Sequence, residues 1–226
     1  MQADGIKVVR CTVERLMKQY GLQGVWRGTG KITTNSRDDQ KRADDLVNRN
    51  FNAHRPNQLW VADFNYIKTI NGWVYTAFII DVFARVIVSW KVSNRINTDM
   101  VMVALNQALA GRNKPKDLIH HSDRGVQYLS IRYTDKIAES NVIASVGANG
   151  YSYDNALAET VNGLYKSEVI HYLKESWNGI KDVELATLEW VDWFNKTRLH
   201  STIGYVSPFD FEKRYYDNLI LSGIAA

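Results

Sequence analysis

Cysteine, proline and long apolar runs are scarce in this chain of 226 residues, which has one cysteine and three prolines. The single Cys11 cannot form a disulfide within the chain, so nothing in the sequence requires an oxidising compartment. No apolar run approaches the roughly 20 residues that span a bilayer, and the first residues lack the apolar core of a secretion signal. We therefore expect a globular, cytosolic protein with no membrane partner.

A charge excess of one sign is also absent from most of the chain. Residues 56–226 hold seventeen Lys or Arg against eighteen Asp or Glu, whereas residues 1–55 hold eleven against six. A basic arm beside a nearly neutral core suits contact with a phosphate backbone, although such an excess is also common on ordinary solvated surfaces. The sequence thus divides into a basic N-terminal helix and linker (1–55), a core (56–216) and a tail (217–226).

The N-terminal part is expected to hold one amphipathic helix followed by the linker. Apolar side chains recur at helical spacing over residues 8–20, and Gly21 then offers a stop. Residues 24–50 are rich in Gly, Thr, Asp and Arg with little apolar periodicity. This composition indicates a linker, with a short helix near residues 40–47.

The core should begin with three strands in close succession. Residues 58–68, 73–81 and 85–92 are rich in Val, Ile, Tyr, Phe and Trp, and Asn71-Gly72 is a hairpin signal between the first two. Both faces of the first strand are largely apolar, which favours a central position in a sheet.

The second half of the core changes to alternating helices and strands. Strands that are joined through helices pair in parallel, so we predict an α/β fold with a mixed five-stranded sheet: an antiparallel meander plus parallel strands, flanked by helices. The expected elements are a helix over 98–110, a strand over 117–121, a helix over 130–140, a strand over 142–146, a glycine-bearing loop over 147–153, a helix from the cap Asp154 to about 170, and a helix over 182–194 that precedes a polar turn and a short tail.

Three carboxylates dominate the functional interpretation. Asp63 lies inside the first strand, Asp123 closes a later strand, and Glu159, which thirty-five residues separate from Asp123, lies on a helix. Such residues can converge on one edge of a sheet, where hard oxygen ligands hold Mg²⁺. Each acid also has an ordinary alternative: a satisfied strand carboxylate, a turn-capping Asp, or a solvated helix residue.

Five ordered runs of residues form one larger pattern. They are Trp60–Asp63, Ile80–Arg85, His120–Gly125, Ser152–Glu159 and Trp193–Asn195. Together they resemble the integrase-type DDE core of bacterial insertion-sequence transposases, specifically the second-reading-frame product of the IS-three type, a relative of retroviral integrases.

The resemblance implies a ribonuclease-H-like fold in which Asp63, Asp123 and Glu159 bind two Mg²⁺ or Mn²⁺ ions when DNA is bound. It implies a DNA transposase that nicks DNA and transfers strands, works as a homo-oligomer on transposon ends and target, and acts in the bacterial cytoplasm at the nucleoid. The positions expected to contact DNA, each with a structural alternative, are Lys166, Asn155, Arg198, His200 and Arg15.

The sequence also departs from the family pattern. The N-terminal piece resembles only the tail of a helix-turn-helix-like region, so we expect a shortened reading frame, a processed product or the downstream half of a fusion with an upstream reading-frame product. Asn65 stands where the family frequently has Thr. Two alternative functions therefore stay open: a catalytically silent DNA-binding remnant, and another ribonuclease-H-like nuclease.

Overall fold

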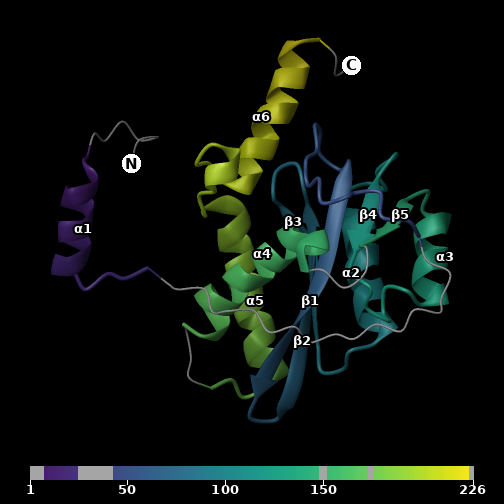
Figure 1. Ribbon diagram of the computed structural model, residues 1–226, viewed down its shortest axis with the longest axis horizontal. Helices are drawn as coiled ribbons and strands as arrows, with labels where there is room; N and C mark the ends of the chain where they lie inside the picture. The colour runs from purple at the N-terminus through teal and green to yellow at the C-terminus, as the bar shows by residue number, and fades with distance from the viewer. Residues whose placement is uncertain (1–7, 25–42, 148–151, 173–175, 224–226) are drawn as a thin grey trace.

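A computed structural model describes residues 8–24, 43–147, 152–172 and 176–223. Its centre is a five-stranded sheet with the strand order β3-β2-β1-β4-β5 (Figure 1). The strands are β1 (Leu59–Thr69), β2 (Gly72–Asp81), β3 (Ile87–Ser93), β4 (Ile119–Ser122) and β5 (Ile143–Val146). The helical segments are α1 (Arg10–Gln19), α2 (Thr98–Gly111), α3 (Ile131–Glu139), η1 (Ser152–Asn155), α4 (Ala156–Tyr165), η2 (Lys166–Ile170), α5 (Ile180–Lys196), η3 (Ser201–Ile203) and α6 (Pro208–Leu221).

The sheet is mixed, as expected from the order of elements. β1 pairs antiparallel with β2, and β2 with β3, whereas β1, β4 and β5 pair in parallel. The prediction that the first strand is central is confirmed. The hairpin is confirmed too, although its two turn residues are Ile70 and Asn71, because Gly72 already pairs with Thr69.

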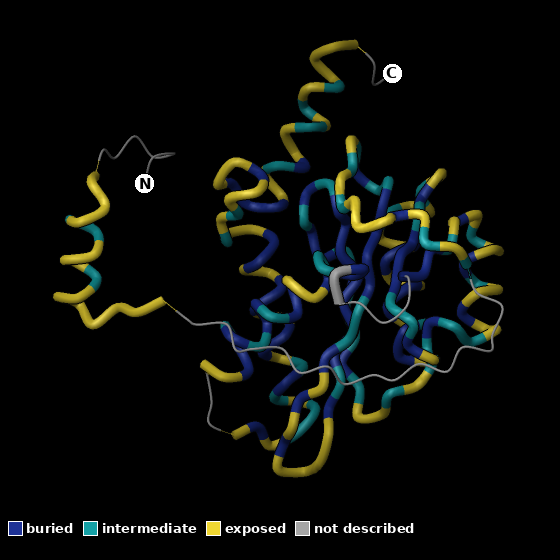
Figure 2. The backbone as a smooth tube through the Cα atoms, viewed as in Figure 1, coloured by how far each residue is buried: buried dark blue, intermediate teal, exposed yellow. Residues whose placement is uncertain are grey.

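Helices cover both faces of the sheet and form two cores. On one face, α2 and α3 pack on Trp60, Ala62 and the strand residues beside them. On the other face, α4 and α5 pack on Val61, Phe78 and their neighbours. Alternate residues of β1 enter opposite cores, as the period of a strand requires. By contrast, α1 has no buried residue (Figure 2).

Two sequence expectations about helices are wrong. Residues 43–47 are not helical: the Asp45 carboxylate accepts hydrogen bonds from the backbone N–H groups of Val47 and Asn48, and positive φ angles at Asn48 and Arg49 turn the chain. The polar turn and tail instead include the helix α6. Its start was readable, since Ser207 caps the helix and Pro208 occupies its first position.

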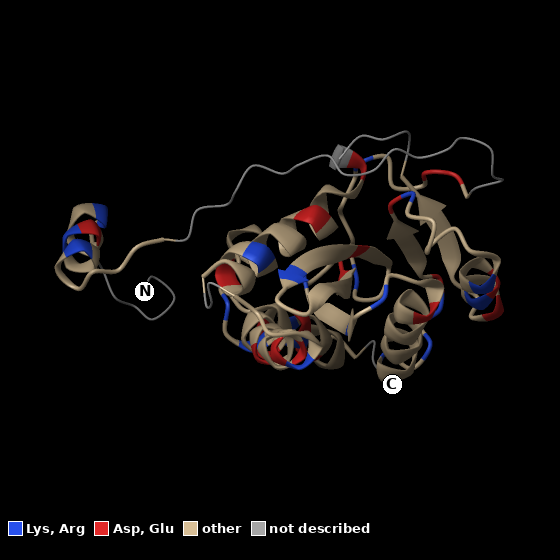
Figure 3. Cartoon of the chain, turned by 90° about the horizontal axis from the view of Figure 1, so that it is seen from below, with Lys and Arg blue, Asp and Glu red and all other residues tan. Residues whose placement is uncertain are grey.

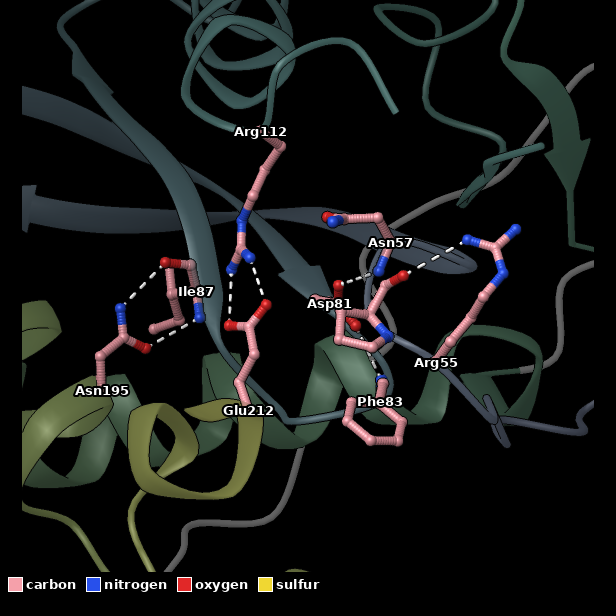
Figure 4. A network of polar contacts seen from close by, with 9 residues as sticks. Arg55, Asn57, Asp81, Phe83, Ile87, Arg112, Asn195 and Glu212 are labelled. Atoms are coloured by element: carbon pink, nitrogen blue, oxygen red, sulfur yellow. Dashed lines mark hydrogen bonds and ion pairs between the residues drawn. The ribbon is translucent and has the colours of Figure 1, made fainter. Parts of the chain in front are cut away.

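A buried polar network holds the end of β2 that lies away from the turn (Figure 4). The Asp81 carboxylate accepts hydrogen bonds from the backbone N–H groups of Asn57 and Phe83, at 2.6 and 2.8 Å. Beside it, Arg112 of α2 forms a bidentate ion pair with Glu212 of α6. These contacts give Asp81 a structural role.

Among the residues that the structure describes, none of the helices combines the length and the apolar character needed to cross a membrane. The expected linker over 25–42 and residues 148–151 of the glycine-bearing loop lie outside the described residues.

Candidate functional site

Parallel pairing between β1 and β4 brings two of the three carboxylates together. Ala62 pairs with Ser122, so Asp63 and Asp123 are the next residues on neighbouring strands. β4 ends at this point, whereas β1 continues to Thr69, and the carboxyl ends of parallel strands are where α/β folds commonly form their sites. Both side chains are half-buried there.

Asp63 is held by two hydrogen bonds, one to each of its oxygens. The backbone N–H of Phe64 donates to Oδ1 at 2.8 Å, and Nδ2 of Asn162 donates to Oδ2 at 2.7 Å. Burial raises the pKa of Asp63 well above its usual range, the charges of Asp123 and Glu159 raise it further, and the two hydrogen bonds act in the opposite direction.

Asp123 and Glu159 complete the group. The backbone N–H of Gly125 donates to Oδ1 of Asp123 at 2.9 Å, while burial raises the pKa of this carboxyl group. Glu159 lies on the exposed side of α4, and its pKa is raised by burial and by the charge of Asp123. The three acids are therefore close enough to interact electrostatically, and no described ion pair joins any of them to a lysine or arginine.

Two amide side chains, Asn65 of β1 and Asn162 of α4, form a hydrogen-bonded chain that ends at Asp63. Nδ2 of Asn65 donates to Oδ1 of Asn162 at 2.7 Å, which leaves Nδ2 of Asn162 free to donate to Asp63. Both asparagines are buried, with exposed fractions of 1% and 6%. The sequence interpretation did not give them this role. The available signal was the position of Asn162, three residues after Glu159 and hence near it on the same helix.

The connection that leads into α4 is fixed by buried contacts. His121 Nε2 bonds the Asp154 carbonyl oxygen at 2.8 Å, and Arg49 Nε donates to the Asp154 carboxylate at 2.7 Å. The expectation that Asp154 caps the helix is wrong, because its carboxylate is engaged by Arg49 and the cap residue is Asn155. Asn155 itself donates Nδ2 to the carbonyl oxygen of Ala62 at 2.9 Å, next to Asp63.

The residues expected to contact DNA lie in different environments. Lys166 is half-buried at the start of η2, where the backbone hydrogen bonding changes from the α-helical to the wider π-helical pattern. The Arg198 guanidinium forms an ion pair with Glu168 at 2.8 Å and lies over the Phe194 ring. His200 packs edge-on against Phe194, and burial with the nearby Arg198 charge lowers its pKa to about 4. Arg15 lies on the solvent-exposed helix α1, where Figure 3 shows charges of both signs.

The donor set suits a hard divalent cation. The charge of Asp123 raises the pKa of both other carboxylates, so the group gains from any cation that neutralises it, and Mg²⁺ and Mn²⁺ prefer oxygen ligands. Within the described ranges, however, no three His, Cys, Asp or Glu side chains are already grouped tightly enough to hold an ion. The residues therefore fit a cation chemically.

Family models and relatives agree on one class of protein. A model described as "Integrase core domain" matches residues 53–152, and a second with the same description matches residues 141–208. The transposase for insertion sequence element IS629 of Shigella sonnei is 52% identical over 223 residues, covering 99% of this chain and 74% of that protein.

Solved structures show the same fold. An intasome chain of simian T-cell lymphotropic virus, in complex with a PP2A regulatory subunit, matches with a TM-score of 0.61 and 16% identity, covering 79% of this chain and 60% of that one. The integrase catalytic core domain of HTLV-2, solved with magnesium in a dimeric form, matches with a TM-score of 0.54 and 18% identity, covering 70% of this chain and 98% of that one. The expected ribonuclease-H-like fold is confirmed.

Proposed function

The chain belongs to the bacterial insertion-sequence transposases that have an integrase core domain, and from this premise we propose that it catalyses metal-dependent nicking and strand transfer of DNA. The observation that supports this most is the group formed by Asp63, Asp123 and Glu159. Asp63 and Asp123 lie side by side on neighbouring strands, the charge of Asp123 raises the pKa of Asp63 and of Glu159, and none of the three acids has a described cationic partner. A cation from solution is the natural partner for such a group.

We assign the three carboxylates as ligands of two Mg²⁺ or Mn²⁺ ions. Two bound ions supply activation of the attacking oxygen and stabilisation of the leaving oxygen during in-line displacement at phosphorus. The protein holds the three carboxylates in position. Backbone N–H groups fix Asp63 within β1 and Asp123 just after the end of β4, and Glu159 comes from a helix whose entry is held by His121 and Arg49.

DNA is the proposed substrate and partner. The basic excess in residues 1–55 suits sequence-independent contact with phosphates, with Arg15 on its helix, and residues 56–216 form the proposed catalytic core. Lys166, seven residues after Glu159, is the proposed contact with the DNA end, and Asn155, Arg198 and His200 complete the proposed set. We expect several copies to act together on paired ends, with an upstream reading-frame product as a further partner and the nucleoid as the place of action.

The test is a cutting and joining assay on oligonucleotides that contain an end of the element, with Mg²⁺ or Mn²⁺. Asp63→Asn, Asp123→Asn and Glu159→Gln should each remove cut and joined products while leaving the melting temperature intact. Asp135→Asn, an exposed acid on α3, is the matched control and should behave as wild type. Activity that survives in all three ligand variants would refute the assignment, and a wild-type protein that binds but never cuts would indicate the silent remnant.

A further inference from the structure

The hairpin of β1 and β2 continues beyond the carboxylates, and its two faces differ. β4 pairs with β1 only over Leu59–Ala62, so the rest of β1 is paired with β2 alone among the described strands. One face is covered: Ile67 and Val74 are 1% and 3% exposed, and the backbone N–H of Ile70 donates to the carbonyl oxygen of Trp177.

The opposite face presents four aromatic side chains, which we call the aromatic stripe: Phe64 and Tyr66 of β1, with Trp73 and Tyr75 of β2. Tyr66 pairs with Tyr75 across the strands. Ring centroids lie 5.7 Å apart for Phe64 and Tyr66, and 5.3 Å apart for Tyr66 and Tyr75. Tyr66 is 46% exposed and Trp73 is 54% exposed, so the stripe offers ring surface to solvent.

The aromatic stripe begins beside Asp123. The side chains of Asp63 and Phe64 point to opposite faces of the sheet, but the Phe64 ring lies beside Gly125, whose N–H bonds Asp123. A Cβ placed on Gly125 would lie 3.3 Å from Cε1 of Phe64 and 3.0 Å from Oδ1 of Asp123. Burial, Tyr75 and the charges of Asp123 and Asp63 raise the pKa of Tyr66, which agrees with this proximity.

Away from the carboxylates, the charges beside the aromatic stripe favour an anionic ligand with flat rings. No acidic residue occurs between Asp63 and Asp81, whereas the exposed Lys68 pairs across the strands with Trp73. Arg95, which is also exposed, follows two residues after Ser93, the β3 partner of Tyr75. Aromatic side chains beside basic residues are the usual means of binding unpaired nucleic-acid strands, because every base has a face that can stack.

We propose that the aromatic stripe stacks unpaired bases of a DNA strand that leads to the three carboxylates. The direction toward the carboxylates depends on the proposed function, whereas the stacking itself does not. Tyr66 and Trp73 are the most exposed rings and are expected to make the main contacts, while Lys68 would face the phosphates.

The experiment measures binding without catalysis. The full chain is titrated in EDTA, so that no strand is cut, with a single-stranded oligonucleotide containing 2-aminopurine and with a blunt duplex of the same sequence. Stacking on a ring quenches 2-aminopurine fluorescence. Tyr66→Ala and Trp73→Ala should each reduce the quenching and weaken single-strand affinity by about fivefold to a hundredfold, with little change for the duplex.

Two control variants separate ring chemistry from general effects. Tyr66→Phe keeps the ring and should keep the affinity. Tyr205→Ala removes a tyrosine that is 63% exposed on the segment after α5 and should have no effect. A melting temperature and a solution mass are measured for each variant, so that a folding defect is recognised.

Three results would overturn the proposal. The first is a single-strand affinity equal to that of wild type in both Tyr66→Ala and Trp73→Ala. A smaller oligomer for Trp73→Ala without DNA would show that a second copy covers the stripe, and a lowered melting temperature with unchanged DNA affinity would show that the chain itself covers it. Failure of the proposed function gives a different result. If the wild type never cuts DNA in Mg²⁺ but binds single strands through these rings, the proposed function is wrong and the proposal about the stripe stands.

Discussion

The β1–β2 pair carries two acids, Asp81 and Asp63, that lie only three positions apart on the ladder but on opposite faces of the sheet, and their surroundings differ. Asp81 accepts two backbone hydrogen bonds, and the charge of Arg112, which pairs with Glu212, lowers its pKa. Asp63 meets two further acids and no described cation. Burial outweighs the favourable contacts in both places, because it raises the pKa of Asp81 to about 6 and that of Asp63 well above its usual range.

The difference separates an acid that the protein's own groups stabilise from acids that have no described cationic partner. Around Asp81 the protein supplies its own cations and donors, so the network holds α2, α6 and the end of β2 together. Around Asp63 the uncompensated charge disfavours the free protein and favours binding of a divalent cation. Burial alone would not have separated the two groups, since each contains acids that are shielded from solvent.

The largest expected effect comes from neutralising Asp63. Asp63→Asn should lower the rate of strand cutting by about a thousandfold or more, because metal coordination supplies several kcal/mol to the transition state. Single-turnover kinetics on a pre-formed DNA complex would measure this. A rate within about tenfold of wild type would mean that Asp63, like Asp81, is structural.

The network beside Asp81 should respond to substitution in stability and not in rate. Glu212→Ala leaves Arg112 buried without its partner and should reduce the free energy of unfolding by about 3–5 kcal/mol. Denaturant unfolding would show the loss, while the folded fraction should cut DNA at the wild-type rate. The double variant Arg112→Met, Glu212→Leu should recover much of the stability, since it removes both charges together.

A smaller effect is expected at the amide chain that supports Asp63. Asn162→Ala removes the donor to Oδ2 and should weaken Mn²⁺ binding about tenfold to a hundredfold, the usual range for residues that orient a ligand. Calorimetric titration of the DNA-free protein measures this affinity. Asn65→Ala, which removes only the group that orients Asn162, should have a weaker effect of the same sign, and an unchanged affinity in both variants would contradict the role.

The smallest effect is a change of stability with pH in the metal-free protein. Because the folded-state pKa of Asp63 is raised, the folded protein binds the proton more readily, and stability attributable to Asp63 falls as pH rises from about 4 through that pKa. Asp63→Asn should therefore be more stable than wild type by on the order of 1 kcal/mol at neutral pH, with the difference closing in acid.

The comparison of wild type with Asp63→Asn cancels the contributions of the histidines to stability, which change with pH in the opposite direction. His120 and His200 have pKa values lowered to about 4, so their stability contributions increase with rising pH in both proteins alike. Saturating Mg²⁺ should also close the difference between wild type and Asp63→Asn, because the ion compensates the charge. A difference that persists in Mg²⁺ would show that Asp63 does not bind it.

Local sequence signals predicted most of the fold, because they report on contacts between near neighbours. The alternation in β1 and the Asn-Gly signal placed the hairpin, and helical spacing placed α2 and α3 within one or two residues. The wrong predictions concern segments in which a side chain interacts with nearby or distant backbone groups. Asp45 turned an expected helix into an irregular segment, and Ser207 and Pro208 began a helix that apolar spacing had not indicated.

The sequence by itself determined which residues bear charge, which alternate between two cores, and that three acids stand at points where strands and a helix meet a sheet edge. Only the tertiary structure decided their environments. The Asn65–Asn162–Asp63 chain spans about a hundred positions, and the Arg49–Asp154 pair spans 105. The Arg198 guanidinium forms an ion pair with Glu168. Such pairings depend on where parallel strands and their helices come together in space, and local sequence has no periodicity that encodes a contact between segments so far apart.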